Sequence, residues 1–512
     1  MSKGVYTSRL KNAKRNIISG FVKTFVVIIL NFVIRTAVLY YLGAEYQGLS
    51  GLFTSILQVL NLTDLGFSSA VTFILYKPIA DNDIDTICAI VAFLKKAYKI
   101  IGIVILVSGL ILMPFLPQLI SGDCPSDINI YILFSLYLFN AVISYLLFAY
   151  KSTLLTAMQR EDIVSNVYSF TTLVSKGIQF LILLLFRNYY LYILIIPIGS
   201  IINNILLHVC SLKAFPDIIP KGEVNSQIKN ELVKQVKAVF IGRISDIARN
   251  SFDNIVLSAF LGLVVVAVYD NYYYIFSAVY GFMGMIAHAI RASVGNSIVK
   301  ETSEKNYHDC MKFSFIFMWI VGWCSICMCC LYQPFMLMWM KGNLNLLLSI
   351  PNMLLFCVYF YAISLTYTKG IYLEARGLFW ECRQWYIFEA VGNLVLNIIL
   401  GYFFGVTGIL VATIITILIF NYIGGTLVLF KYYFKIGFQE FFASHIKYFV
   451  VTVLNGLVTY LICSLIAGEG VVNFVIKLVI CILLPNSIYL GTYLKTKMFN
   501  ESFNTFKRVL RK

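Results

Sequence analysis

The hydrophobic residues of this chain are gathered into long stretches separated by short polar segments. A helix needs about 20 mainly apolar residues to cross a hydrocarbon layer roughly 30 Å thick. Fourteen stretches reach this length, and none shows the period-two alternation of a membrane β-barrel strand. The pattern therefore predicts an all-α polytopic membrane protein, with spans at residues 17–42, 49–76, 97–119, 129–150, 165–186, 190–212, 237–262, 265–290, 313–337, 346–367, 384–404, 406–430, 447–467 and 471–494.

Composition supports this interpretation. Of the 512 residues, 60% are hydrophobic and 12% are charged, and the mean hydropathy is +0.83. Soluble proteins average about 45–50% apolar and about 25% charged residues, so a soluble enzyme, a disordered chain and a disulfide-stapled module are excluded. The net charge of +16 would suggest nucleic acid in a soluble protein. In a membrane protein it first indicates sidedness, and no nucleic-acid partner is expected.

The basic residues alternate between successive loops. Thirty-one of the 40 Lys and Arg residues fall on one side of the predicted membrane, whereas the opposite loops contain Arg187 and Lys341. The remaining seven lie within predicted spans. Because basic loops stay inside, we expect a multi-pass protein of the cytoplasmic membrane with both termini in the cytoplasm. Residues 1–15 lack a signal-peptide cleavage site, so the first span is expected to stay in the mature protein.

The two halves of the chain resemble each other at an offset of 217 to 219 residues. Six spans separate equivalent positions, so the repeat is parallel, with its axis along the membrane normal. We expect a lobe of six helices at residues 1–213, a linker at 214–236, a second six-helix lobe at 237–432 and a C-terminal helix pair with a basic tail at 433–512. The landmarks are Leu42 and Gly43 with Leu261 and Gly262, Lys95 with Lys312, and Ala157, Tyr168 and Phe170 with Ala375, Tyr386 and Phe388.

Span seven carries a polar stripe. At about 100° per residue, its charged and amide side chains fall within an arc of roughly 140°. Ionisable groups inside a membrane usually face a bundle interior or a watery cavity. The stripe therefore predicts either a cavity wall or an ion-pair ladder between helices; its members are Arg243, Asp246, Arg249, Asn250, Asp253 and Asn254.

Span one places Lys23, Asn31 and Arg35 on one face and contains no acidic residue. Uncompensated cations in hydrocarbon are unfavourable. Either a partner such as Asp64 reaches them, or an anionic ligand binds, since Arg and Lys both suit phosphate oxygens.

Other charged and amide groups lie in later spans. Lys176 and Arg291 can add to the field of span one, although Lys23 and Arg291 can also extend to the cytoplasmic interface. Glu389, Asn393 and Asn397 lie on one helix face. The two Asn residues are expected to bond to a neighbouring helix. Glu389, like Asp64, is either a proton or cation site or a fixed charge partner.

Metal, cofactor and catalytic sites are not expected. The Cys-x-x-Cys formed by Cys324 and Cys327, with Cys329 and Cys330 beside it, lies in an apolar stretch and is interpreted as packing residues. The predicted outside loops are short, and nucleotide-binding and paired-carboxylate motifs are missing. A membrane enzyme, such as a polysaccharide polymerase or ligase, is therefore improbable.

The order and spacing of several motifs resemble the polysaccharide transporter (Wzx-type) branch of the MOP flippase superfamily, along essentially the whole chain. These motifs are Leu42-Gly43-x4-Gly48, Asp64-Leu65-Gly66-Phe67, Ala375-Arg376-Gly377 and Asn393-x3-Asn397-x3-Gly401-x3-Gly405-x2-Gly408. The resemblance implies a MATE-like transporter that flips undecaprenyl-diphosphate-linked oligosaccharide repeat units by alternating access, for export of capsule or O-antigen-type polysaccharide. A polysaccharide polymerase and export machinery are the implied partners.

The resemblance also suggests roles for the buried charges. Arg35, Arg243 and Arg249 would attract the diphosphate and first sugars, while the polyprenyl tail stays in lipid. Coupling to a proton or Na⁺ would use Asp64, Asp246, Asp253 or Glu389. Two alternatives remain: a lipid II-type flippase, whose substrate has the same diphosphate, and a MATE-type drug antiporter, which fits the wholly basic stripe of span one less well.

Overall fold

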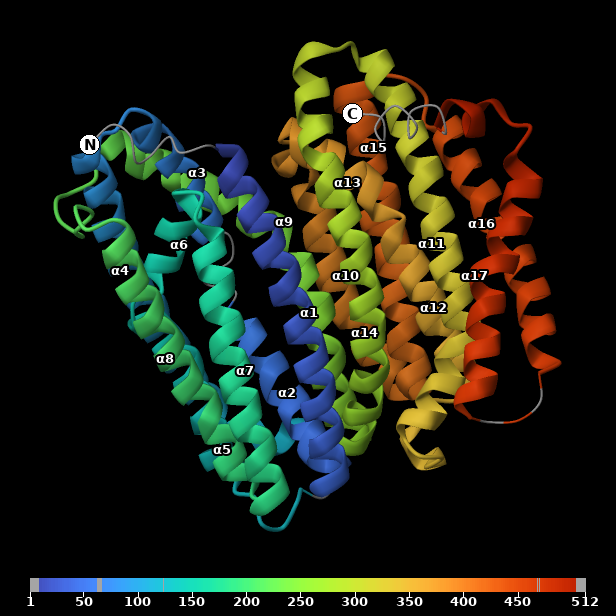
Figure 1. Ribbon diagram of the computed structural model, residues 1–512, viewed down its shortest axis with the longest axis horizontal. Helices are drawn as coiled ribbons and strands as arrows, with labels where there is room; N and C mark the ends of the chain where they lie inside the picture. Colours follow the sequence, from blue (N-terminus) through green and yellow to red (C-terminus); the bar gives the residue numbers. More distant parts are fainter. Residues whose placement is uncertain (1–8, 62–66, 123, 467, 469, 503–512) are drawn as a thin grey trace. The chain divides into compact units, whose positions relative to one another are not determined.

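The computed structural model describes residues 9–61, 67–122, 124–466, 468 and 470–502. All regular structure within these residues is helical. The chain forms two compact units, Met1–Ala267 and Val268–Lys512. Figure 1 shows the helices of each unit running side by side. The predicted all-α polytopic fold class is confirmed.

In the first unit, α1 packs along α7, α5 packs between α4 and α8, and α9 lies against α2 and α3. Its core is a continuous cluster of buried aliphatic and aromatic side chains contributed by most of these helices. The helices are α1 (Arg9–Tyr41), α2 (Ala44–Leu60), α3 (Phe67–Ala80), α4 (Ile84–Leu112) with the short helix η2 (Met113–Leu119), α5 (Ile130–Leu146), α6 (Tyr150–Ala157), α7 (Glu161–Leu185), α8 (Tyr189–Ala214) and α9 (Ser226–Leu261).

In the second unit, α11 contacts α12, α16 and α17. The helices are α10 (Leu263–Lys300), which begins in the first unit, α11 (Ser303–Trp339), η3 (Leu344–Leu346), α12 (Ile350–Ser364), α13 (Thr366–Arg376), α14 (Phe379–Thr416), η4 (Ile417–Gly424), α15 (Gly425–Leu429), η5 (Phe430–Phe434), α16 (Gln439–Ser464) and α17 (Val471–Tyr493). The segments η4 and η5 are π-helical.

Helix α14 turns back on itself at Gly405. The backbone there has φ 58° and ψ −134°, a conformation that favours glycine. Beyond the turn, Thr413 lies beside Asn393, whose Nδ2 donates to its Oγ1 at 3.1 Å. The helical passage Phe379–Phe434 therefore contains both of the spans predicted at residues 384–404 and 406–430.

The other predicted spans also lie on helices. Among the described residues, nine helices are long and apolar enough to cross a membrane, and the bent pair α5 and α6 makes a tenth. The predicted second span is divided between α2 and α3, which are too short to count singly. The seventh and eighth lie on α9 and α10, which do not meet the criterion as single described helices.

Several helices start at residues whose side chains cap the backbone. Asp83, Asn129, Asn188, Asn225 and Thr302 each accept a hydrogen bond from a backbone N–H in the first turn of α4, α5, α8, α9 and α11, respectively. Such caps satisfy N–H groups that have no partner within the helix. The polar residues between the apolar stretches therefore determine locally where these helices begin.

The helix boundaries reproduce the predicted repeat. Helix α7 begins at Glu161 and α14 begins at Phe379, which is an offset of 218 residues. Helices α1 and α9 both end beside a glycine with positive φ, Gly43 and Gly262, and a new helix follows directly. Because both halves use the same sequence of breaks, the boundaries support an internal duplication.

The two compact units divide the chain later than the predicted linker at residues 214–236. Helix α9, which the repeat assigns to the second half, packs with the first unit through α2, α3 and η2. This packing depends on close backbone approach, since Gly48 lies against the backbone of Leu263 and the Ser121 N–H donates to the Ser258 carbonyl at 2.9 Å.

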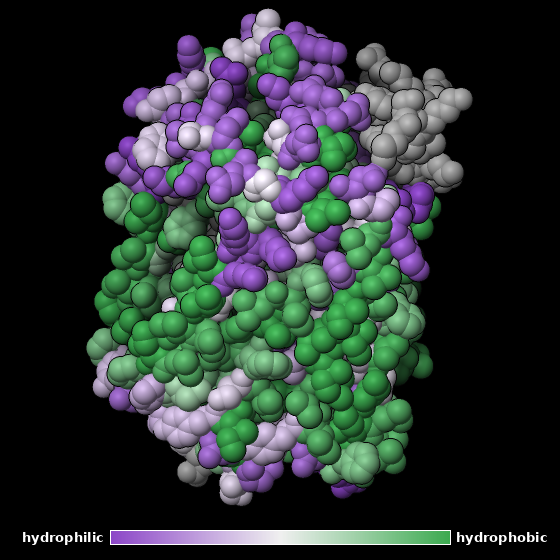
Figure 2. All heavy atoms as spheres, turned by 90° about the vertical axis from the view of Figure 1, so that its left-hand side faces the viewer, coloured by the Kyte–Doolittle hydropathy of each residue, from purple (hydrophilic) through white to green (hydrophobic). Residues whose placement is uncertain are grey.

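The surface carries a broad hydrophobic band. Figure 2 shows this band on one face, between ends where hydrophilic residues gather. Large aliphatic side chains on α4 and α8 are exposed, including Ile103, Val107, Ile198 and Ile202. Exposed apolar side chains over the length of a membrane span indicate contact with lipid.

Candidate functional site

Arg249 and Asp246 form an ion pair on α9. Nη2 of Arg249 lies 2.7 Å from Oδ1 of Asp246. The arginine is 4% exposed, whereas the aspartate side chain is 48% exposed. This contact is the i, i+3 ion pair that the ladder interpretation of the stripe predicts. The exposed carboxylate also leaves this end of the pair open to solvent or a ligand.

The rest of the described stripe is used in helix packing. Asn254 donates to the Ser55 hydroxyl at 3.0 Å, and Ser251 bonds to Gln58 at 3.1 Å, so both connect α9 with α2. Asp253 is buried on the same helix. This half of α9 therefore holds two helices together through polar contacts.

Three predicted site groups cannot be compared with these contacts. Asp64 lies outside the described residues, and so do the side chains of Arg243 and Asn250, although their backbone belongs to α9.

A cavity of about 380 Å³ lies among α1, α5, α7 and α8 in the first unit, and Asn31 and Lys176 both line it. Its wall also carries hydroxyl and amide groups, including those of Thr171, Gln179 and Asn203. The structure thus brings together two residues predicted from different spans. The amide and hydroxyl lining was missed, although polar residues recur along one face of α7.

The other two cations of the α1 stripe lie beside aromatic rings. Nζ of Lys23 lies 5.1 Å from the centroid of the Tyr168 ring, a residue that also lines the cavity. The charge of Arg35 acts on the phenol of Tyr192. A search for acidic partners could not find this environment, because the face of a ring is itself attractive to a cation.

Arg291 is paired with an acid that the sequence did not single out. Its Nη2 lies 2.8 Å from Oε2 of Glu374, which joins α10 to α13 in the second unit. The two side chains are 43% and 40% exposed. Arg291 is therefore neutralised by a partly hydrated partner.

Glu389 belongs to a buried polar chain that includes Lys369. The Lys369 ammonium donates to Oδ1 of Asn421 at 2.8 Å, and Nδ2 of Asn421 donates to Oε2 of Glu389 at 2.8 Å. Lys369 and Glu389 are 2% and 1% exposed. The amide of Asn421, on the π-helical segment η4, thus bridges two opposite charges with both of its polar atoms correctly oriented.

Asn393 and Asn397 extend this polar region along α14. Asn397 donates to Asn393 at 3.2 Å, and Asn393 donates to Thr413 beyond the turn at Gly405. Both amides are buried. These are the interhelical contacts that the packing role predicts.

Two lysines counted from the sequence as loop cations are buried in the structure. Lys151 on α6 is 1% exposed, and Lys369 on α13 is 2% exposed. Their assignment to cytoplasmic loops was wrong, because each lies on a short helix that continues a membrane span. Their equal place in the repeat was the signal that could have identified them.

Comparison with known proteins adds information on the fold. No protein-family model matches the sequence, and none of the curated proteins is similar to it. Among solved structures, the lipid II flippase MurJ in an inward closed conformation is similar, with a TM-score of 0.70 at 15% identity. The alignment covers 93% of this chain and 99% of that one.

Two multidrug transporters are similar as well. An inward-facing MATE-family transporter of the MOP superfamily has a TM-score of 0.61 at 12% identity, covering 80% of this chain and 97% of that one. A MATE transporter from Vibrio cholerae has a TM-score of 0.59 at 13% identity, covering 82% and 97%. The chain has the MOP transporter fold. The predicted MATE-like MOP fold is thereby confirmed, and the Wzx branch remains a prediction.

Proposed function

We propose that this MOP-fold protein is a Wzx-type flippase that moves undecaprenyl-diphosphate-linked oligosaccharide repeat units across the cytoplasmic membrane, for export of a capsule or O-antigen-type polysaccharide. The observation that carries the proposal is the coverage of the chain. The lipid II flippase structure accounts for 93% of it, whereas the two MATE structures account for 80% and 82% although they are themselves covered almost completely. A transporter of lipid-linked substrates therefore fits the length of this chain better.

The buried cations supply the chemistry for an anionic headgroup. A guanidinium can hold phosphate oxygens through two parallel hydrogen bonds, and an ammonium acts as a point charge. In our proposal, Arg35, Arg243 and Arg249 hold the diphosphate, with Lys23, Lys176 and Asn250 nearby. The half-exposed Asp246 supports this role for Arg249, because a phosphate can replace or share a hydrated carboxylate partner. Arg291 would act only after separating from Glu374.

Acidic groups are proposed to couple transport to a proton or Na⁺. Glu389 is favoured by its place in a buried chain with Lys369, where a change in protonation would alter the balance of charge. Asp246 and Asp253 are proposed as charge partners of the α9 cations. Asp64 keeps both predicted roles.

The lipid tail, the topology and the partners complete the proposal. Helices α16 and α17 expose many large apolar side chains, including Leu454, Leu457 and Val475, which suits a surface against a polyprenyl chain. Both termini are placed in the cytoplasm by the distribution of basic residues. The flipped repeat unit would be passed to a polysaccharide polymerase and export machinery.

A lipid II-type flippase is the second candidate, favoured by the similarity to the MurJ structure. The two functions differ in the precursor that they move. We expect deletion of the gene to cause a complete lipid-linked repeat unit to accumulate inside the cell, as measured by mass spectrometry of extracted lipids. Accumulation of lipid II would support the second candidate, and accumulation of neither precursor would contradict both.

A further inference from the structure

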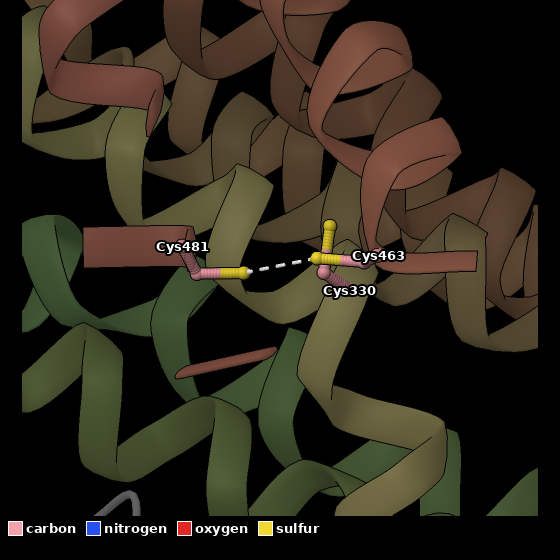
Figure 3. Close-up of side chains that lie close together, drawn as sticks. All are labelled: Cys330, Cys463 and Cys481. Carbon is pink, nitrogen blue, oxygen red and sulfur yellow. Dashed lines mark hydrogen bonds between the residues drawn. The ribbon is translucent and has the colours of Figure 1, made fainter. Parts of the chain in front are cut away.

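Three buried cysteines from distant parts of the second unit converge on one point. Cys330 lies on α11, Cys463 on α16 and Cys481 on α17, and their sulfur atoms all lie within 4.8 Å of one another. Figure 3 shows the three side chains directed toward a common centre. Because hundreds of millimolar of thiol could not be gathered this way by local sequence alone, this convergence is a property of the helix packing.

A proline in α17 draws a fourth cysteine to the cluster. Pro485 has no N–H, so the carbonyl of Cys481 loses its normal helical donor. That carbonyl instead accepts from Nε1 of Trp323 at 2.8 Å and from the thiol of Cys327 at 3.6 Å. The Cys481 thiol also interacts with the thiols of Cys327, Cys330 and Cys463. The cluster therefore contains four sulfur atoms, two of them from the Cys-x-x-Cys unit of residues 327 and 330.

The sulfur separations fit a metal better than a disulfide. Sγ of Cys463 lies 3.9 Å from Sγ of Cys481. With Zn–S bonds of about 2.3 Å, neighbouring ligand sulfurs lie about 3.8 Å apart in a tetrahedral site and about 4.0 Å apart in a trigonal one. A disulfide needs about 2.05 Å, and all three cysteines are free.

The local charge also suits a divalent cation. Three thiolates and one Zn²⁺ leave a single negative charge, which would be costly in a buried place without compensation. Lys477 lies one helical turn before Cys481, and its charge acts on Cys463. One ammonium thus neutralises the assembly.

We propose that Cys330, Cys463 and Cys481 bind a Zn²⁺ ion as thiolates, with Cys327 available as the fourth ligand. The ion would fasten the C-terminal helices α16 and α17 to α11. Such a site is structural, because its ligands come from the protein and are buried. It is independent of the proposed substrate.

The test uses the full-length protein purified in detergent without added chelator. We expect about one zinc per chain by inductively coupled plasma mass spectrometry, as four-coordinate structural sites hold one ion. Cys481→Ser should reduce zinc affinity by more than the roughly 10- to 100-fold typical of second-shell changes. Cys310→Ser should leave it unchanged, since Cys310 is equally buried on α11 but does not belong to the cluster.

A second measurement covers variants that fail to fold. Wild-type protein stripped of metal and loaded with Co²⁺ should show the thiolate-to-cobalt charge-transfer bands and visible absorption of a sulfur-coordinated site. Zinc that is retained in Cys481→Ser would overturn the proposal. Copper in place of zinc, a Cys463 to Cys481 disulfide in the native protein, or wild-type protein without zinc and without the cobalt spectrum would also overturn it.

Discussion

Lys151 and Lys369 occupy equivalent positions in the two halves of the chain, 218 residues apart, and both are buried. Lys151 lies on α6, with its Nζ 5.6 Å from the centroid of the Tyr150 ring. Lys369 lies on α13 and bonds to Asn421. A buried ammonium is costly unless it is paired. Its presence at the same place in each repeat therefore indicates that these short helices carry polar interactions within the helix packing.

Removing the ammonium of Lys369 should destabilise the protein strongly. Lys369→Met leaves Asn421 without its donor and Glu389 buried beside an uncompensated amide. We expect a loss of about 3–5 kcal/mol, as for other buried pairs that lose one partner. The measurement is the Tm of the purified protein in detergent.

The matched control for this change is Lys305→Met. Lys305 pairs with Glu301 at 2.7 Å on the surface, and its side chain is 54% exposed, so the expected loss is about 0–1 kcal/mol. The double variant Lys369→Met, Glu389→Gln should recover stability relative to Lys369→Met alone, because it leaves no buried charge. Equal Tm values for the single and double variants would contradict the coupling.

Gly408 should not tolerate a larger side chain. A Cβ atom at this position would overlap the carbonyl oxygen of Leu400 across the turn of α14. Backbone cannot move away as a flexible side chain can, so Gly408→Ala should cost at least about 1–3 kcal/mol. Membrane-inserted protein and its Tm measure the effect. Gly281→Ala serves as the control, since a Cβ at Gly281 meets nothing within 4 Å, and similar losses in both variants would refute the steric explanation.

Arg249→Ala should stop export while the protein remains in the membrane. The change removes a guanidinium that we place on the diphosphate and leaves Asp246, which is half-exposed and can be hydrated. Surface polymer should fall at least about tenfold, since a charge-assisted bond is worth about 1.5–3 kcal/mol. Lys237→Ala, an exposed position on the same helix, should export normally. Unchanged surface polymer in Arg249→Ala would count against the proposed headgroup site.

The start of α4 should weaken in acid because of Asp83. Hydrogen bonds from the Thr86 hydroxyl and N–H lower the pKa of this carboxyl below its usual value of 3.8. Its stabilising contribution is therefore complete above the unfolded pKa and is lost as the pH falls through the lowered folded pKa. Hydrogen exchange in the first turn of α4 should be faster in Asp83→Ala than in wild type near neutral pH, and the two should converge in acid.

Asp83→Asn provides the control, because its amide oxygen can cap the helix without titrating. Its exchange should stay slow as the pH falls through the titration range of wild type. If the wild-type turn showed the same pH dependence as Asp83→Asn, the titration of Asp83 would not control it.

The apolar spans, their approximate limits and the internal repeat could be predicted from the sequence. In lipid the backbone must satisfy its own hydrogen bonds, so a sufficient length of apolar residues already specifies a helix. Capping residues such as Asn129 and Asn188 are equally local. The cations of span one and the amides of α14 were identified because charge and amide groups are rare in such stretches.

The partners of these groups were decided by tertiary structure alone. Nothing local to Glu389 reveals that Asn421 joins it to Lys369, or that Lys23 lies beside the ring of Tyr168. Likewise, Cys463 and Cys481 meet Cys330 only because α16 and α17 pack against α11. Helix formation in a membrane depends on nearby residues, whereas a side chain's partner depends on which helix faces are brought together from distant parts of the chain.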